Sequence, residues 1–438
     1  IYAISDGEGG EDTATATFSV TPNDLATIGG DISGSVMERG FDFFGATGRG
    51  DLAPLTPTSI RADWDSGNLE GGQISADGRY VLYEDNTSSW NSNFQGANIF
   101  RKDLLTGEMK PVDVDAQGNH GTGDSQQGID ISADGRFVLF TLDAYGDVNL
   151  DPNAPADQGN QTGPLFRKDM DTGAVVRVDV LSDGSYVTPM WGVGSAKMSA
   201  DGNVVVFEHG NTEYAGLDAV SGGHDHIYHK NLTTGELRVV DIKPDGTLSD
   251  MTASDGGYGI DVSDDGSVVT FLSSRSGSDY SSAGPTDLVS GVDVSPYSSI
   301  YVRDMNVSSG TPVTLANAAP DGTPSDNNNY GSGSVVSGNG EYVAFTSAAS
   351  NLVEGVSGGP QVYVKNLSTG EVVVASETAD GIPGNGFSAI NSMSFSSDGR
   401  FLSFESSASN LVEGDTNDKY DVFVKDLQTG AIELVSVG

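Results

Sequence analysis

The chain has 438 residues, of which 62 are acidic and only 21 are basic, so its formal net charge is −41 at neutral pH. A polyanion of this kind repels other polyanions, which excludes nucleic acids and anionic membrane surfaces as partners. Cysteine is absent, which excludes disulfides and thiolate metal sites, and no apolar run is long enough to span a bilayer. The 59 glycines and the lack of a long amphipathic pattern favour many short strands over helices.

Residues 1–22 have the pattern of a β-hairpin. Residues 6–10 form its turn, and residues 13–20 alternate as an exposed strand does. The segment resembles the last hairpin of a bacterial cadherin-like or Ig-like tandem repeat, and this resemblance implies that the chain belongs to a larger modular protein. Because a lone hairpin is marginally stable, we expect it to pair with the rest of the chain, with a further domain, or with a neighbouring molecule.

Residues 69–438 contain six copies of one unit, and residues 23–68 form a leader without it. Each copy has a Ser-x-Asp/Asn-Gly turn, an apolar strand, a loop, a second strand rich in β-branched and aromatic residues, and a Thr-Gly or Ser-Gly turn. The turn glycines recur at intervals of 57 to 74 residues, a period typical of propellers and arrays. The copies span residues 69–118, 119–184, 185–246, 247–320, 321–381 and 382–438.

The last copy carries the clearest resemblance to a known family. Residues 396–430 read SSDGRFLSFESSASNLVEGDTNDKYDVFVKDLQTG. This pattern resembles the TolB-like, PD40-type β-propeller repeat of bacterial secreted and envelope proteins. The resemblance implies an all-β, six-bladed propeller, with seven blades as the alternative, preceded by an N-terminal strand extension. The leader, with a candidate strand at residues 55–62, is then expected to close the ring as a strand or as a partial seventh blade.

The acidic loop of the last copy is the first candidate metal site. Asp415, Asn417, Asp418 and Asp421 offer hard oxygen ligands within seven residues, and Ca²⁺ takes such ligands in irregular geometry. The loop lacks the glycine and the final glutamate of an EF-hand. A calcium loop and a solvated, Asx-rich turn therefore both remain open.

The insert of the second copy is the other candidate calcium site. Asp147, Asn149 and Asp151 alternate as ligands do at the start of an EF-hand loop. Pro152 stands where an EF-hand has glycine, and Gln158 stands at the twelfth position in place of glutamate. We therefore expect a one-ion loop or no site, rather than a helical EF-hand.

Histidines gather in the third copy, at His224, His226 and His229. On a strand, His224 and His226 point to the same side, whereas His226 and His229 point to opposite sides. A transition-metal site built from neutral imidazoles and a carboxylate is one hypothesis. Exposed histidines on an outer loop or edge are the other.

No sequence pattern in the chain indicates a particular catalytic reaction. The G-x-S-x-G nucleophile elbow is missing, and the glycines lie in hairpins rather than in phosphate-binding loops. The leading hypothesis is therefore a non-catalytic, extracellular or cell-surface bacterial module for binding, adhesion or scaffolding, with Ca²⁺ in its loops. Its expected partner is an extracellular polysaccharide or a surface protein. The alternatives are a fibre or surface-layer subunit that self-associates through its N-terminal strand, and a polysaccharide-active enzyme.

Overall fold

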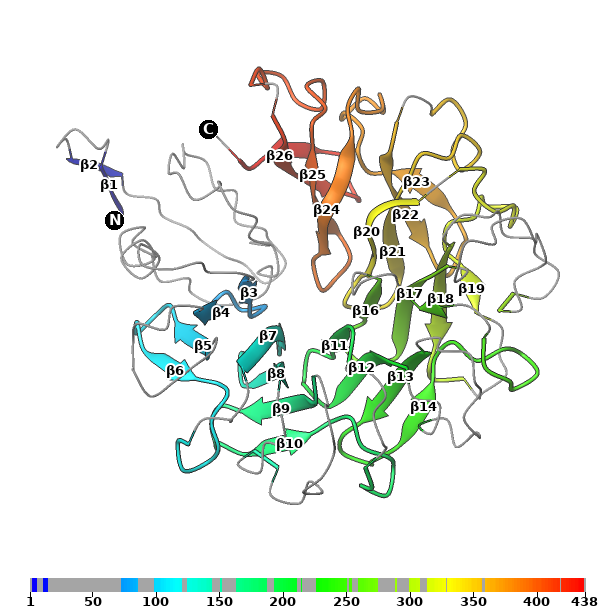
Figure 1. Ribbon diagram of the computed structural model, residues 1–438. Coiled ribbons are helices and arrows are strands. Elements are labelled where there is room, and N and C mark those ends of the chain that lie inside the picture. Colours follow the sequence, from blue (N-terminus) through cyan, green and yellow to red (C-terminus); the bar gives the residue numbers. More distant parts are fainter. Residues whose placement is uncertain are drawn as a thin grey trace.

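The computed structural model describes the N-terminal hairpin and most of the six repeats (Figure 1). The described residues are 2–5, 11–14, 72–85, 98–119, 124–143, 150–151, 163–186, 193–210, 214, 226–249, 252–253, 259–274, 288–289, 299–307, 313–327, 329–356, 359–417 and 419–436. All regular elements among them are β-strands. The hairpin pairs β1 (Tyr2–Ser5) with β2 (Glu11–Ala14) in an antiparallel sheet of its own.

Six further sheets, the blades, follow in chain order, and the first three are regular four-stranded meanders. Blade 1 contains β3 (Gly72–Ile74), β4 (Tyr80–Asp85), β5 (Asn98–Asp103) and β6 (Met109–Pro111). Blade 2 contains β7 (Asp124–Ile131), β8 (Phe137–Asp143), β9 (Leu165–Asp169) and β10 (Val175–Arg177). Blade 3 contains β11 (Ala196–Met198), β12 (Val204–His209), β13 (His226–Asn231) and β14 (Leu237–Val239).

The last three blades repeat this order. Blade 4 contains β15 (Thr252–Ala253), β16 (Ile260–Val262), β17 (Val268–Ser274), β18 (Ser299–Asp304) and β19 (Thr314–Leu315), and both β15 and β16 pair with β17. Blade 5 contains β20 (Asn329–Val336), β21 (Tyr342–Ser347), β22 (Gln361–Asn366) and β23 (Val372–Val374). Blade 6 contains β24 (Ser388–Phe395), β25 (Phe401–Ser406), β26 (Asp421–Asp426) and β27 (Ile432–Leu434).

The Ser-x-Asp-Gly turn joins the first and second strands of a blade and locks itself with local hydrogen bonds. In blade 2, Ser132 Oγ donates to Asp134 Oδ1 at 2.7 Å and accepts from the Phe137 amide at 2.8 Å. Gly135 has φ of 71°, and a Cβ there would lie 2.1 Å from the Tyr80 ring of blade 1. Only glycine meets both demands, because it tolerates positive φ and leaves room for the ring.

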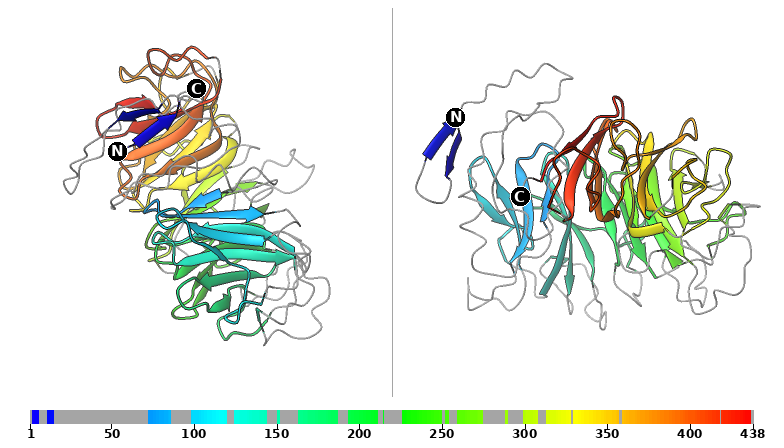
Figure 2. Two further views of the ribbon diagram at one scale, coloured as in Figure 1. Left: turned by 90° about the vertical axis from the view of Figure 1, so that its left-hand side faces the viewer. Right: turned by 90° about the horizontal axis from the view of Figure 1, so that it is seen from above.

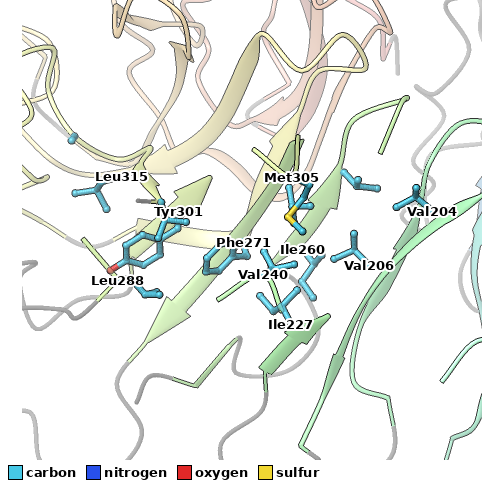
Figure 3. Packing of buried hydrophobic residues seen from close by; sticks show 14 residues of the cluster. Val204, Val206, Ile227, Val240, Ile260, Phe271, Leu288, Tyr301, Met305 and Leu315 are labelled. Atoms are coloured by element: carbon cyan, nitrogen blue, oxygen red, sulfur yellow. The ribbon is translucent and has the colours of Figure 1, made fainter. Parts of the chain in front are cut away.

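Apolar side chains fill each described junction between neighbouring blades. Figure 3 shows the cluster of blades 3 and 4, in which Val206 and Ile227 pack with Ile260 and Phe271. Comparable clusters join blades 1 and 2, 2 and 3, 4 and 5, and 5 and 6. The core is therefore divided among the junctions, which places the blades side by side in chain order (Figure 2).

In blades 2 to 6, a buried Lys or Arg on the third strand donates hydrogen bonds to main-chain carbonyls of the preceding blade. Lys365 of blade 5, for example, donates to the carbonyls of Leu315 and Ala318 in blade 4 at 3.1 and 3.0 Å. The other cations at this position with such a bond to the preceding blade are Lys168, Lys230, Arg303 and Lys425. Since an unpaired buried charge is costly, these bonds fix the distance between the blades.

The structure confirms an all-β, six-bladed propeller, and the described residues form six blades. The predicted hairpin is present, with its second strand at β2 rather than at residues 13–20, of which residues 15–20 lie outside the described residues. The leader, including residues 55–62, also lies outside them, so ring closure by the leader stays a prediction.

Candidate functional site

The long loop between the second and third strands of each blade is where the predicted metal ligands lie. The Ser-x-Asp-Gly turns of neighbouring blades are hydrogen-bonded to one another, for instance from the Ala133 amide to the Ala200 carbonyl at 2.9 Å. These turns therefore share one face of the ring. Because the strands are antiparallel, the loops between second and third strands emerge on the opposite face, as recognition loops commonly do.

The loop of blade 6 carries four of the predicted ligands. Asp415 is half-buried, and the exposed Asn417 accepts a hydrogen bond from the Lys419 amide at 2.8 Å through Oδ1. Asp421 begins β26, is only 4% exposed, and accepts a hydrogen bond from Ser436 Oγ at 2.7 Å. Asp418 lies outside the described residues.

The insert of blade 2 carries the other three predicted ligands, and Asp147 and Asn149 lie outside the described residues. Asp151 is buried, and its two carboxylate oxygens lie 3.0 and 2.8 Å from the Tyr186 hydroxyl. Burial and the bond to Asp151 raise the pKa of Tyr186 to about 12, so the phenol stays protonated and donates. Asp151 therefore fixes the position of Tyr186, which lies in the segment between β10 and β11.

Next to Tyr186 lies a polar cluster that the sequence patterns did not reveal. Arg177 on β10 makes a bidentate ion pair with Asp179, with both N–O distances 3.0 Å, and its guanidinium lies over the Tyr186 ring. Tyr214 donates to the Asp179 carbonyl at 2.9 Å. The residues that stand where blade 2 has Arg177 are all apolar: Pro111, Val239, Leu315, Val374 and Leu434. An arginine at this otherwise apolar position of the repeat is the signal that could have found the cluster.

The histidines of blade 3 are buried in the sheet, so the prediction of exposed edge histidines is wrong for His226 and His229. They lie on β13, the third of four strands, which is covered on both faces. His226 Nδ1 is 2.7 Å from Asp241 Oδ2, and His229 Nε2 is 2.9 Å from the Gly266 carbonyl of blade 4. His209, opposite His226 on β12, has its pKa lowered to about 4 by burial. His224 lies outside the described residues.

Within the part of the chain that the structure describes, no three His, Cys, Asp or Glu side chains come together as a metal-binding group. His226 contacts Asp241, which follows β14 of its own blade, whereas His229 reaches blade 4, and residues three apart on a strand point to opposite sides. Three of the seven predicted calcium ligands lie outside the described part. Calcium binding by either loop therefore stays a prediction.

The innermost strands place one residue per blade at the same register position, around the common centre seen in Figure 1. Each pairs with the third residue of the second strand; the six are Gln73, Asp130, Lys197, Asp261, Val335 and Ser394. Asp130 Oδ2 accepts from the Met198 amide of blade 3 at 2.8 Å. Asp261 Oδ2 accepts from the Val336 amide of blade 5 at 2.9 Å. Both carboxylates thus cap the free edge of the next blade.

Charge alternates along three neighbouring positions of this ring, with Lys197 between Asp130 and Asp261. Burial raises the pKa of Asp130, and it raises the pKa of Asp261 to about 6, while the positive charge of Lys197 acts to lower both. All three side chains keep some solvent exposure. The central ring can therefore offer carboxylate acceptors and an ammonium donor to a polar ligand.

Solved structures similar to this chain include several propellers. The β-propeller domain of the Trilobed protease from Pyrococcus furiosus matches over 84% of each chain, at 12% identity and a TM-score of 0.47. A putative TolB from Agrobacterium tumefaciens matches over 77% of this chain and 88% of its own, at 16% identity and a TM-score of 0.39. An acylaminoacyl peptidase from Pyrococcus horikoshii matches over 84% of this chain but 45% of its own, at 14% identity and a TM-score of 0.45.

No protein-family model matches the chain, and no curated protein matches it in sequence. Among the described residues, no helix is long and apolar enough to cross a membrane. The likenesses to solved structures concern the fold alone.

Proposed function

We propose that this chain is a non-catalytic, extracellular propeller that binds a partner in adhesion or scaffolding, with calcium in its loops. The observation that supports this role is the recurrence of the polar contacts between blades. The cation on the third strand reaches main-chain carbonyls of the preceding blade in five of the six blades. A contact repeated in this way has a structural role, and it makes the ring a rigid support for its variable loops.

The charge of the chain narrows the chemistry of the partner. With a net charge of −41, a neutral polysaccharide or a cationic surface is favoured over an anionic one. The central ring adds two carboxylate acceptors and an ammonium donor at Asp130, Asp261 and Lys197, which suit sugar hydroxyls. We therefore place an extracellular polysaccharide first and a surface protein second.

Retention on immobilised ligands tests this role. The full chain is passed over neutral and acidic extracellular polysaccharides and over surface-protein extracts, at fixed ionic strength with Ca²⁺. We expect the chain to be retained on a neutral polysaccharide even at high salt. We also expect weaker retention of Lys197→Met, because this variant removes the ammonium donor of the central ring. A chain that none of these surfaces retains would contradict a binding module.

Self-assembly is the second candidate, favoured by the N-terminal hairpin. Among the described residues, β1 and β2 pair only with each other, so each strand presents an unpaired edge. Such an edge can accept a strand from a neighbouring molecule. Electron microscopy of the full chain should then show filaments that disappear when residues 1–22 are removed, whereas single particles in both samples would count against assembly.

A further inference from the structure

The loops of blades 5 and 6 begin identically, which makes one the control for the other. Both open with Ser-Asn-Leu-Val-Glu-Gly, at residues 350–355 and 409–414. The asparagine anchors the loop in the same way in each blade: Asn351 Nδ2 donates to the Pro324 carbonyl at 2.7 Å, and Asn410 Nδ2 donates to the Pro383 carbonyl at 3.1 Å. Beyond this shared start, the blade 5 loop carries no acidic residue, whereas the blade 6 loop carries Asp415 and Asp418.

The buried residue that ends each loop changes together with the loop. Gln361 begins β22 and is 1% exposed. Its Oε1 accepts from Ser376 Oγ at 2.6 Å, and its Nε2 donates to the Gly384 carbonyl at 3.0 Å. The amide of blade 5 is therefore satisfied at both ends by neutral partners.

Blade 6 has Asp421 in the place of Gln361, and only one of its two carboxylate oxygens is hydrogen-bonded among the described residues. Oδ1 accepts from Ser436 Oγ at 2.7 Å, which repeats the contact between Gln361 and Ser376. Oδ2 is buried and has no hydrogen-bond partner among the described residues. A carboxylate cannot donate as the amide does, so the blade gains a buried negative charge without a counterpart.

An unpaired, buried carboxylate oxygen is costly, and buried charges are normally paired or bound to a metal. Blade 6 therefore differs from blade 5 in two ways that both add negative charge: acidic residues within the loop and an acidic residue where the loop ends. Like charges in one short segment repel each other. A cation bound by Asp421 and by the loop carboxylates would neutralise this repulsion and would give the buried oxygen a partner. The ligands on offer are oxygens of carboxylates, an amide and the main chain, a set that suits Ca²⁺.

We propose that blade 6 binds a hard divalent cation, represented by Ca²⁺, with Asp421 Oδ2 as its buried ligand and Asp415 and Asn417 as ligands from the loop. This inference rests on the proposed function, of which it specifies the calcium site. Through Ser436, the same carboxylate reaches the segment that follows β27. The cation therefore ties the loop to both outer strands of the last blade.

Calcium titration of the full chain tests the site, after chelator treatment and at fixed ionic strength. We expect one binding event that is much tighter than the diffuse binding of the remaining acidic residues. Asp421→Asn should weaken this event at least about tenfold. Asp380→Asn removes one exposed acidic charge from blade 5 and is the matched control, so its titration should equal that of the natural chain.

Thermal unfolding of the same proteins adds a second readout. Ca²⁺ should raise the Tm of the natural chain above its value in chelator. In chelator, Asp421→Asn should unfold at a higher temperature than the natural chain, because a neutral amide replaces the buried, unpaired carboxylate. Asp421→Gln, which copies blade 5, keeps the test valid if the asparagine variant fails to fold.

Equal titrations of the natural chain and Asp421→Asn would overturn the proposal, as would equal Tm values of the natural chain with Ca²⁺ and with chelator. Retention on polysaccharide is measured separately in Asp421→Asn. The cation site can therefore fail while binding persists, and binding can fail while the cation site persists.

Discussion

At the scale of residues, the six copies of the repeat separate structural polar groups from unusual ones. The Asp or Asn at the end of the third strand has a local structural role: Asp103 accepts hydrogen bonds from the amides of Leu105 and Thr106. The bond from the Tyr214 hydroxyl to the Asp179 carbonyl could not be predicted from the repeat, because Tyr214 lies between β12 and β13 of blade 3 and Asp179 follows β10 of blade 2. Such pairings need the stacking of blades, which a single repeat does not contain.

The pH dependence of stability tests the central ring at this scale. The pKa of Asp261 is raised to about 6, above its ordinary value of about 3.9, so the folded state holds this proton more tightly. The stabilisation from that proton is present below the ordinary pKa and is lost as pH rises through about 6. Asp261→Asn keeps an acceptor for the Val336 amide and should gain stability relative to the natural chain as pH rises from about 4 to about 7.5.

Denaturant unfolding of both proteins across this range measures the difference. His209, whose lowered pKa destabilises the fold as pH falls, acts equally in both proteins and cancels. A difference that does not change with pH would contradict the burial of Asp261 in its charged form.

At the scale of elements, turns and second strands follow from the sequence, whereas innermost strands do not. The Asp-Gly turns form where the sequence predicts them, and the aromatic residues after them pack between blades: the Tyr342 ring of blade 5 packs where Gly399 of blade 6 would carry a Cβ. Innermost strands are short or irregular, and β7, β20 and β24 contain register shifts. A shift of one residue exchanges the two faces of a strand, so the residues of the central ring could not be assigned from the pattern.

Substitution of two turn glycines with nearly equal φ distinguishes the cost of backbone strain from the cost of a steric clash. Gly399 has φ of 72°, and its Cβ would lie 2.8 Å from Tyr342, whereas Gly430 has φ of 77° and its Cβ would meet no described atom within 4 Å. Gly430→Ala should cost about 1 kcal/mol of the free energy of unfolding, from the backbone alone. Gly399→Ala should cost about 1–3 kcal/mol more, because the ring must move. Denaturant midpoints measure both, and equal costs would show that the turn does not seat the neighbouring ring.

At the scale of the whole molecule, the first and last blades differ from the others in what covers them. Phe100 of blade 1 is half-buried, whereas its counterparts Phe166 and Tyr228 are 1% and 0% exposed. Val422 and Val424 of blade 6 are also half-buried. The outward faces of the terminal blades thus bury less apolar surface than the junctions between them.

Truncation tests the prediction that residues 23–68 close the ring. Removal of residues 1–22 should leave the Tm of the propeller unchanged, because the hairpin forms a sheet of its own. Removal of residues 1–68 should lower the Tm by several degrees, because apolar surface of blades 1 and 6 then becomes exposed. Equal Tm values for the two truncated chains would assign no closing role to the leader.

We propose above all that this propeller binds its partner without changing it chemically. The most direct measurement is product analysis of the polysaccharide that the chain retains, after prolonged incubation with a large excess of protein and Ca²⁺. We expect an unchanged chain-length distribution, with neither new reducing ends nor unsaturated products. Products that accumulate in proportion to protein and time would contradict it and would make the chain a polysaccharide-active enzyme.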